Sequence, residues 1–448
     1  MDYITEKRIL DLIENKEYLQ LKKDLSDMLE VDIAAILDPL DPQTSLLVFR
    51  MLPKDIAVEV FANFSSEQQS GIINSITDIE LEEIIDELFF DDMIDLLEEI
   101  PANLVNKILK NSTKEERALI NEFLKYPQDS AGSIMTIEYV ELKGQMTVKE
   151  AIDHIREIGL TKETIYTNYV TDANRKLIGI VSLRKLVVSE EDSLVSDLML
   201  EDFVYANTHD DQETVAGQFT RYGFLALPVV DKENRLTGII TVDDIMDVVE
   251  QEATEDFQLM AAMSPSEKAY LDTNVLTLAR QRIPWLLVLM VTATFTGRIM
   301  VRYELVLETV IVLGMFIPML MDTGGNSGNQ SSTLIIRGLA TGEIETRDWH
   351  KVLFKEFRVS IIVAIALALI NFIRLITLEQ ISPSISLVVS LTIVATVVIS
   401  KIVGGILPII AKKIKLDPAI MAGPLITTVV DTLALLIYFV IATNLLGL

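Results

Sequence analysis

Two carboxylates lie within stretches of sequence apolar enough to enter a lipid bilayer. Asp431 falls inside the apolar run 418–445, and Asp322 ends the apolar run 305–323. Placing a charged carboxylate at the centre of a bilayer costs about 2.5–3.5 kcal/mol on insertion scales, so both side chains should face a pore or a polar cavity. Because carboxylates attract cations and the whole chain is acidic, these residues predict a pathway for a cation.

The polar residues near these carboxylates supply oxygen atoms, which hard cations prefer. After Asp322 the sequence TGGNSGNQ predicts a glycine-rich break in the helix, and it contains Gly325 and the side-chain amide of Asn326. Thr428 precedes Asp431 by about one helical turn. The chain has no cysteine, so thiolate ligands are excluded, and oxygen ligands favour Mg²⁺ over softer metals.

The start of the last apolar run predicts the depth of Asp431 in the membrane. Asp417 followed by Pro418 is typical of a helix N-cap with proline at the first helical position. At ~1.5 Å per residue, Asp431 would then lie about 20 Å along the helix, near the middle of a bilayer core of about 30 Å. The predicted pore residues are Asp431, Asn326, Gly325, Thr428 and Asp417.

The same residues have a purely structural explanation. Asp431 can form an ion pair with Lys401 of the preceding apolar run. Gly324 and Gly328 can serve helix packing alone, because small residues four positions apart let helices approach closely.

The C-terminal part of the chain predicts five membrane spans. Five apolar runs are each close to the ~20 residues that a span requires. These runs are 284–303, 305–323, 352–373, 384–411 and 418–445. With the N-terminus inside, basic residues concentrate at the inner ends of the runs, as the positive-inside rule requires. Five spans then place the C-terminus outside.

The rest of the chain is strongly acidic. The 448 residues carry a net charge of −28, whereas residues 274–448 contain 14 Lys and Arg against 10 Asp and Glu, so the negative excess lies on residues 1–273. Such a region repels itself unless cations intervene. The first residues are charged and lack the apolar core of a signal peptide, which predicts that residues 1–273 stay in the cytoplasm.

The middle of the chain contains an internal repeat. The segment LIGIVSLRKLV from Leu177 recurs as LTGIITVDDIM from Leu236, and each copy predicts the order strand, helix, strand, strand, helix. The repeat resembles a tandem pair of CBS domains over residues 128–250, with copies at about 128–192 and 193–250.

The resemblance to CBS domains implies a nucleotide site in one copy. In that family a Thr and an Asp can hold a nucleotide ribose. Thr241 and Asp244 occupy these positions in the second copy, whereas the first copy has Lys185 in place of the Asp. Binding of ATP and a purely structural CBS pair both fit this pattern.

Helices are expected on either side of the repeat. Residues 1–127 lack glycine-rich loops and show helical spacing of apolar residues, which predicts a small all-helical superhelix. Residues 243–273 predict an acidic connecting helix, where Glu252, Glu255 and Asp256 fall at i, i+3 and i+4. Like charges at this spacing destabilise a helix by a few tenths of a kcal/mol per pair, and a bound cation would reverse that effect. The alternative is a solvated acidic face.

Together these features resemble the MgtE family of magnesium channels over essentially the whole chain. The most specific segments are TGGNSGNQSSTLIIRGLATGEI from Thr323 and LDPAIMAGPLITTVVDTLALLIYF from Leu416. The expected fold class is a multidomain membrane protein. It has an all-α superhelical N-terminal domain at 1–127, an α/β tandem CBS pair, the connecting helix, and an α-helical five-span transmembrane domain at 274–448.

The resemblance implies a homodimer in the plasma membrane. The pore would lie between the second and fifth spans, with Asp431 holding hydrated Mg²⁺, and cytosolic Mg²⁺ would close the gate. The acids implied in sensing Mg²⁺ are Asp211, Glu213, Asp244, Asp247, Glu252, Glu255, Asp256, Asp91, Asp92 and Asp95. Gly223 and Gly423 depart from some members, which carry an acid and an asparagine there.

Other functions fit parts of the sequence. A secondary exchanger coupling Mg²⁺ to Na⁺ or H⁺ would typically show inverted repeats, which five spans cannot form symmetrically. A transporter of broader divalent specificity, including Co²⁺, is a further alternative. The absence of Walker A, HExxH and GxSxG motifs argues against an enzyme. We therefore predict a non-enzymatic protein for magnesium uptake whose partners are the lipid bilayer, Mg²⁺ and a second copy, with no nucleic acid.

Overall fold

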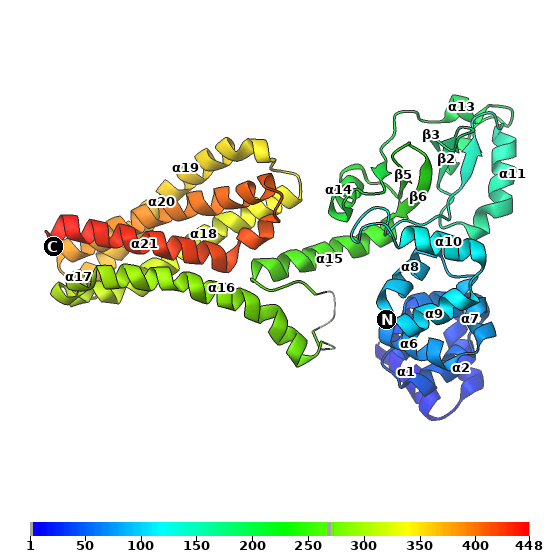
Figure 1. Cartoon of the computed structure of the whole chain (residues 1–448), viewed down its shortest axis with the longest axis horizontal. Coiled ribbons are helices and arrows are strands. Elements are labelled where there is room, and N and C mark those ends of the chain that lie inside the picture. Colours follow the sequence, from blue (N-terminus) through cyan, green and yellow to red (C-terminus); the bar gives the residue numbers. More distant parts are fainter. Residues whose placement is uncertain (1–2, 267–269, 272, 448) are drawn as a thin grey trace. The chain divides into compact units, whose positions relative to one another are not determined.

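The computed structural model describes residues 3–266, 270–271 and 273–447 (Figure 1). The chain divides into two compact units, Met1–Val248 and Val249–Leu448. The first unit contains short helices followed by two small sheets, and the second unit contains long apolar helices.

Short helices joined by tight connections form the N-terminal part of the first unit. Thr77 and Thr113 begin two of them with capping boxes, in which the threonine hydroxyl accepts from a backbone N–H and a glutamate side chain accepts from the threonine N–H. The helices are α1 (Tyr3–Glu14), α2 (Tyr18–Ser26), α3 (Glu30–Leu37), α4 (Pro42–Phe49), α5 (Lys54–Ala62), α6 (Ser66–Ser75), α7 (Asp78–Ile85), α8 (Phe90–Glu99), α9 (Ala102–Asn111) and α10 (Lys114–Phe123).

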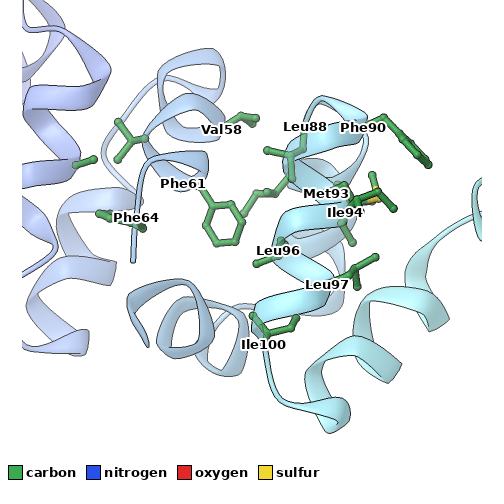
Figure 2. Packing of buried hydrophobic residues seen from close by; sticks show 14 of the residues in the cluster. Val58, Phe61, Phe64, Leu88, Phe90, Met93, Ile94, Leu96, Leu97 and Ile100 are labelled. Atoms are coloured by element: carbon green, nitrogen blue, oxygen red, sulfur yellow. The ribbon is translucent and has the colours of Figure 1, made fainter. Parts of the chain in front are cut away.

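Apolar residues from these helices form one buried core. Phe61 of α5 is fully buried, and Figure 2 shows it gathered with Phe64, Leu96 and Ile100. The same core continues into the second copy of the repeat, where it includes Phe219 and other buried side chains. The helical domain and the second copy therefore pack together within the first unit.

Each copy of the repeat forms a three-stranded sheet, as the internal repeat predicts. In both sheets the first strand pairs with the second in parallel, and the second pairs with the third antiparallel. The first copy contains β1 (Glu141–Lys143), α11 (Val148–Ile158), η1 (Gly159–Thr161), β2 (Thr167–Thr171), β3 (Leu177–Ser182), α12 (Leu183–Val187) and α13 (Val195–Leu198). The second contains β4 (Ala206–Asn207), α14 (Gln212–Tyr222), β5 (Ala226–Val230), β6 (Leu236–Thr241) and the start of α15 (Val242–Met260).

The second unit is a bundle of long helices. The helices α18 and α19 each pack along α20, and α21 packs against both α18 and α20. Its elements are α16 (Val275–Arg302), α17 (Glu304–Thr309), η2 (Ile311–Phe316), α18 (Ile317–Ala340), η3 (Thr346–Asp348), α19 (Trp349–Thr377), α20 (Pro383–Lys413), η4 (Pro418–Met421) and α21 (Gly423–Leu446). Within the described residues, four helices are long and apolar enough to cross a membrane: those at Val275–Arg302, Thr346–Thr377, Pro383–Lys413 and Pro418–Leu446.

The predicted second span, 305–323, is not a single helix. Its residues are divided among α17, η2 and the first residues of α18. The helix that packs through the bundle at this place is α18, which is too polar to be recognised from hydropathy because it contains TGGNSGNQ.

The prediction of a glycine-rich break after Asp322 is also wrong, because α18 continues through TGGNSGNQ without interruption. Glycine weakens an isolated helix in water. In this bundle, however, Gly324 and Gly328 lie buried against α20 and α21, where they allow close packing of the helices.

The last apolar run does not begin as one helix at Pro418. Asp417 does accept a hydrogen bond from the backbone N–H of Ala419, at 2.6 Å, but it caps the short 3-10 turn η4. The helix α21 begins only at Gly423, whose φ of 44° is one that residues with a side chain rarely adopt. Asp431 therefore lies about 12 Å along α21, at ~1.5 Å per residue, rather than about 20 Å along a longer helix.

Candidate functional site

The helices α18 and α21 approach each other closely beside the two intramembrane carboxylates. A Cβ atom added to Gly325 would lie 3.0 Å from Cγ2 of Thr427, so only glycine fits this contact without adjustment. One turn further along α18, the Asn329 side-chain amide donates to the Thr427 hydroxyl at 3.4 Å. The glycines thus bring polar side chains of both helices to one place.

Two acceptor oxygens at this place lack a hydrogen-bond partner within the described protein. They are Oδ1 of Asp431 and Oδ1 of Asn329, and both are shielded from solvent. Asp431 also interacts electrostatically with Asp322 of α18. Buried polar oxygens are normally paired, so unpaired ones at a helix contact suit a transient cation or its water shell.

The other predicted pore residues have distinct surroundings. Asn326 is exposed on α18, and Thr428 is half-buried on α21, where its hydroxyl donates to the backbone carbonyl of Pro424 at 2.8 Å. That bond leaves the Thr428 oxygen able to accept. Asp417 caps η4, as described above, and this hydrogen bond gives it a structural role.

The alternative pairing of Asp431 with Lys401 does not occur. The Lys401 ammonium instead donates to α18, at 3.5 Å from the Ser327 carbonyl oxygen and 3.4 Å from the Gln330 side-chain oxygen. Asp431 is therefore not neutralised by the lysine of the preceding helix.

A second group of carboxylates gathers in the first unit, between α8 and the start of α15. Asp91, Asp92 and Asp95 lie on α8, and all three interact electrostatically with Asp244 of α15. Residues about 150 positions apart in the chain are brought together here by the shared core of the helical domain and the second repeat copy.

Burial and mutual repulsion raise the pKa values of these acids. Burial raises the pKa of Asp91 to about 9, with a further contribution from the charge of Asp244. Burial likewise raises the pKa of half-buried Asp92 to about 6, and the charge of Asp244 adds to this rise. The pKa of Asp244 is also raised by burial, although its bond with the Thr241 hydroxyl opposes the rise. The cluster therefore holds protons near neutral pH and resists accumulating charge without a counter-ion.

Sequence reasoning missed one member of this group, Glu163. Burial raises its pKa to about 7, and the carboxylates of Asp244 and Asp243 add to the effect. Glu163 lies in the loop after η1 of the first repeat copy. No local pattern of residues marks this loop, because its partners are distant in sequence.

The raised pKa values predict how the stability of the first unit depends on pH. A carboxyl group with a raised folded-state pKa binds more protons when folded, so the free energy of unfolding falls as the pH rises between about 4 and about 9. In full-length protein in detergent with EDTA, we expect the melting temperature of this unit to fall by several degrees from about pH 5.5 to about pH 8.5.

Substitutions test which groups cause this dependence. Glu163→Gln removes a half-buried group that ionises within that range, so it should flatten the curve, whereas Glu14→Gln, at an exposed position on α1, should not. A melting temperature that rises with pH would contradict the placement of these acids.

The remaining acids implied in Mg²⁺ sensing do not all join this group. Asp247 interacts electrostatically with Asp244. Asp211 instead caps α14, where its carboxylate accepts from the backbone N–H of Glu213 at 3.1 Å, and Glu213 is exposed. Among the described residues, no three acidic or histidine side chains are arranged so that they could hold a metal ion.

The acidic positions predicted at i, i+3 and i+4 lie on α15. Glu252 and Asp256 are half-buried and Glu255 is exposed, all within the second unit. Because α15 is continuous over these residues, the three carboxylates lie next to one another on one face of the helix.

Thr241 and Asp244, the two residues that the CBS resemblance implies in holding a nucleotide ribose, are in direct contact. The Thr241 hydroxyl donates to Oδ2 of Asp244 at 2.5 Å, at the junction of β6 and α15. In the first copy the equivalent hydroxyl of Ser182 accepts from the backbone N–H of Lys185 at 3.2 Å, so no carboxylate is present there. Asp244 thus belongs both to this pair and to the acidic group on α8.

Family models match most of the chain. A divalent cation transporter model, MgtE, matches residues 317–441, a model of the MgtE intracellular N domain matches residues 28–129, and the CBS domain model matches residues 131–190 and 195–251.

Individual relatives are similar over nearly their full length. The magnesium transporter MgtE of Thermus thermophilus is 36% identical over 95% of this chain and 95% of its own, and that of Bacillus subtilis is 35% identical over 92% and 93%. Among solved structures, the cytosolic domain of the Mg²⁺ channel MgtE in complex with ATP matches with a TM-score of 0.52 at 34% identity. It covers 54% of this chain and 99% of that chain. The soluble part of a magnesium transporter matches with a TM-score of 0.52 at 29% identity, covering 56% and 98%.

Proposed function

Because this chain belongs to the MgtE family of divalent cation transporters, we propose that it carries Mg²⁺ across a membrane between α18 and α21. Long apolar helices make it a multi-pass membrane protein. The observation that carries the proposal is the pair of unpartnered oxygens on Asp431 and Asn329 at the contact of these two helices.

The chemistry of the site suits a hydrated cation. Mg²⁺ releases its water molecules reluctantly, so a carboxylate with neighbouring hydroxyl and amide oxygens can bind the ion through its hydration shell. One carboxylate on α21 attracts the ion without an all-protein cage, which allows it to leave again. Thr427 and Thr428 add hydroxyl oxygens one turn before Asp431.

A second copy of the chain would complete the pathway. Asp322 and Asn326 are exposed on α18 in a single chain, although α18 belongs to the membrane domain. Intramembrane polar residues normally face a cavity or another protein surface. A homodimer that places these faces opposite one another would enclose the ion on all sides.

We further propose that the acidic part of the chain is cytosolic and senses Mg²⁺. Carboxylates repel one another in two places when no cation is present, at α8 with the start of α15 and at Glu252, Glu255 and Asp256 further along α15, and Mg²⁺ would bridge the members of each group. An ion that binds one arrangement better than another shifts the equilibrium toward it, so the permeant ion can close its own pathway. ATP would bind the second CBS copy through Thr241 and Asp244, where it would share Asp244 with the acidic group.

Uptake measurements test the transport proposal. Purified protein reconstituted into vesicles should take up Mg²⁺ faster than empty vesicles, and a Mg²⁺ gradient alone should suffice. Uptake that requires a Na⁺ or H⁺ gradient would instead favour an exchanger, and no uptake at all would overturn the proposal.

Neutralising the acids of α15 tests the sensing proposal. Replacing Glu252, Glu255 and Asp256 with their amides should keep the protein conducting at Mg²⁺ concentrations that close the unmodified protein. The measurement is Mg²⁺ flux against Mg²⁺ concentration on the cytosolic side at matched ionic strength, because salt alone screens charge.

A matched control removes the same charge elsewhere. The amide substitutions at Glu190, Glu191 and Asp192 alter three consecutive exposed acids of the first CBS copy, and they should leave closure unchanged. Closure of the α15 variant at the unmodified concentration would show that these acids do not sense Mg²⁺.

A further inference from the structure

Two opposite charges lie buried within the helical bundle, away from the proposed pathway. The Lys401 side chain on α20 is 4% exposed, and the Glu356 side chain on α19 is 8% exposed. Charged residues inside a membrane domain are costly, so those that persist are normally paired and functional. Neither charge has a role in the binding of the ion described above.

One hydroxyl connects these charges through α18. The Ser331 hydroxyl donates to Oε2 of Glu356 at 2.5 Å and accepts from the Lys401 ammonium at 3.4 Å. The same ammonium reaches the Ser327 carbonyl oxygen and the Gln330 side chain. We call Lys401, Ser331 and Glu356 the intramembrane polar triad, which joins α18, α19 and α20.

The triad lies on the face of α18 opposite the proposed pathway. Ser327 and Ser331 are four residues apart and share one face, and Gly325 and Asn329 share another. Ser327 lies two positions after Gly325, which is a rotation of about 200° at 3.6 residues per turn. The observed contacts agree, because Gly325 and Asn329 meet Thr427 of α21 while Ser331 meets α19 and α20.

Beside the triad, α18 packs tightly against α20. A Cβ atom on Gly404 of α20 would lie 2.2 Å from the carbonyl oxygen of Gly328, so the two backbones are in direct contact. Glycine allows this close approach. At such close range a small shift or rotation of α18 would also break the directional hydrogen bonds of the triad, so packing and hydrogen bonding together fix the position of α18.

We propose that the triad positions α18, so that Gly325 and Asn329 stay aligned with Asp431 of α21. This inference rests on the proposed function, because it assumes that Mg²⁺ passes between those helices. Lys401, Ser331 and Glu356 are positioning residues that act through α18 and do not touch the ion.

Two variants separate positioning from charge balance. Glu356→Gln combined with Lys401→Met removes both charges together, and this should preserve folding because no buried charge is left uncompensated. Ser331→Ala removes the connecting hydroxyl and leaves both charges. Ser360→Ala is the matched control, since the buried Ser360 hydroxyl donates within its own helix to the Phe357 carbonyl at 2.7 Å.

The measurement is the Mg²⁺ concentration that gives half-maximal uptake into vesicles, together with the melting temperature of each purified protein. We expect both variants to need about tenfold more Mg²⁺, the effect of losing one hydrogen bond to a charged group. The double variant should melt near the unmodified protein, whereas Ser331→Ala should melt somewhat lower, because two buried charges lose a hydrogen bond. Ser360→Ala should change neither quantity.

Half-maximal concentrations within about twofold of the unmodified value in both variants would overturn the positioning role. Asp431→Ala, measured in parallel, separates this failure from failure of the proposed function. Loss of uptake in Asp431→Ala with normal triad variants refutes the triad alone, whereas normal uptake in Asp431→Ala refutes the pathway itself.

Discussion

Asp431→Ala is expected to reduce Mg²⁺ uptake to the level of empty vesicles. The substitution removes the charge of α21 that faces α18, and the remaining hydroxyl and amide oxygens attract a divalent ion much less strongly. Asp431→Asn should also lose most uptake, because it keeps the shape and one oxygen but not the charge. The bundle should stay folded, since Asp431 Oδ1 has no hydrogen bond to lose within the described protein.

The control for this prediction is Glu343→Ala, at an exposed position after α18. It changes the net charge by the same amount and should transport normally. Uptake near the unmodified rate in folded Asp431→Ala protein would show that Mg²⁺ transport does not require this carboxylate.

Gly404→Ala is expected to have a comparably large effect, although it adds only one methyl group. The new Cβ atom would lie 2.2 Å from a backbone oxygen and 2.9 Å from a backbone carbon of Gly328, so a whole helix must move to admit it. Overpacking of this kind typically costs about 1–3 kcal/mol. We expect a lower melting temperature and loss of Mg²⁺ uptake, because α18 would be displaced from α20.

Gly297→Ala is the matched control within the second unit. A Cβ atom there meets no atom of the chain within 4 Å, and alanine favours the helical conformation of α16. Gly404→Ala protein with unchanged melting temperature and uptake would show that the close contact of α18 with α20 is not needed for transport.

The repeat and the short helices could be predicted because their signals are local. The matching segments that begin at Leu177 and Leu236 each became the last strand of a sheet followed by a helix. Thr113 begins α10 with a capping box to Glu116, only three residues later. Alternation of apolar residues and capping patterns depend on neighbours along the chain, so one sequence is enough to find them.

The glycine-rich part of the membrane domain was predicted wrongly because its stability is not local. The segment TGGNSGNQ is a poor helix by itself, and α18 persists through it because α20 and α21 pack against its glycines. The start of α21 was also displaced, because Gly423, with its positive φ, interrupts a pattern that otherwise continues from Pro418.

The candidate sites were partly predictable. Asp431 stood out because a carboxylate in an apolar run is costly wherever it lies. The gathering of Asp91 with Asp244, and the inclusion of Glu163, could not be derived, because these residues are distant in sequence and meet only through tertiary packing. The contacts of Ser331 with Lys401 and with Glu356 were likewise hidden, since the three residues belong to three different helices.

Electrical recording from purified protein in a lipid bilayer tests the central claim most directly, with Mg²⁺ as the only permeant cation. If the chain forms a Mg²⁺ pathway closed by the ion it carries, unitary currents should appear when the Mg²⁺ concentration is low on the side of residues 1–248 and high on the other side. They should disappear when Mg²⁺ reaches millimolar levels on the side of the acidic unit, and they should be absent for Asp431→Ala. Mg²⁺ movement without unitary currents, and only with a Na⁺ or H⁺ gradient, would contradict the account.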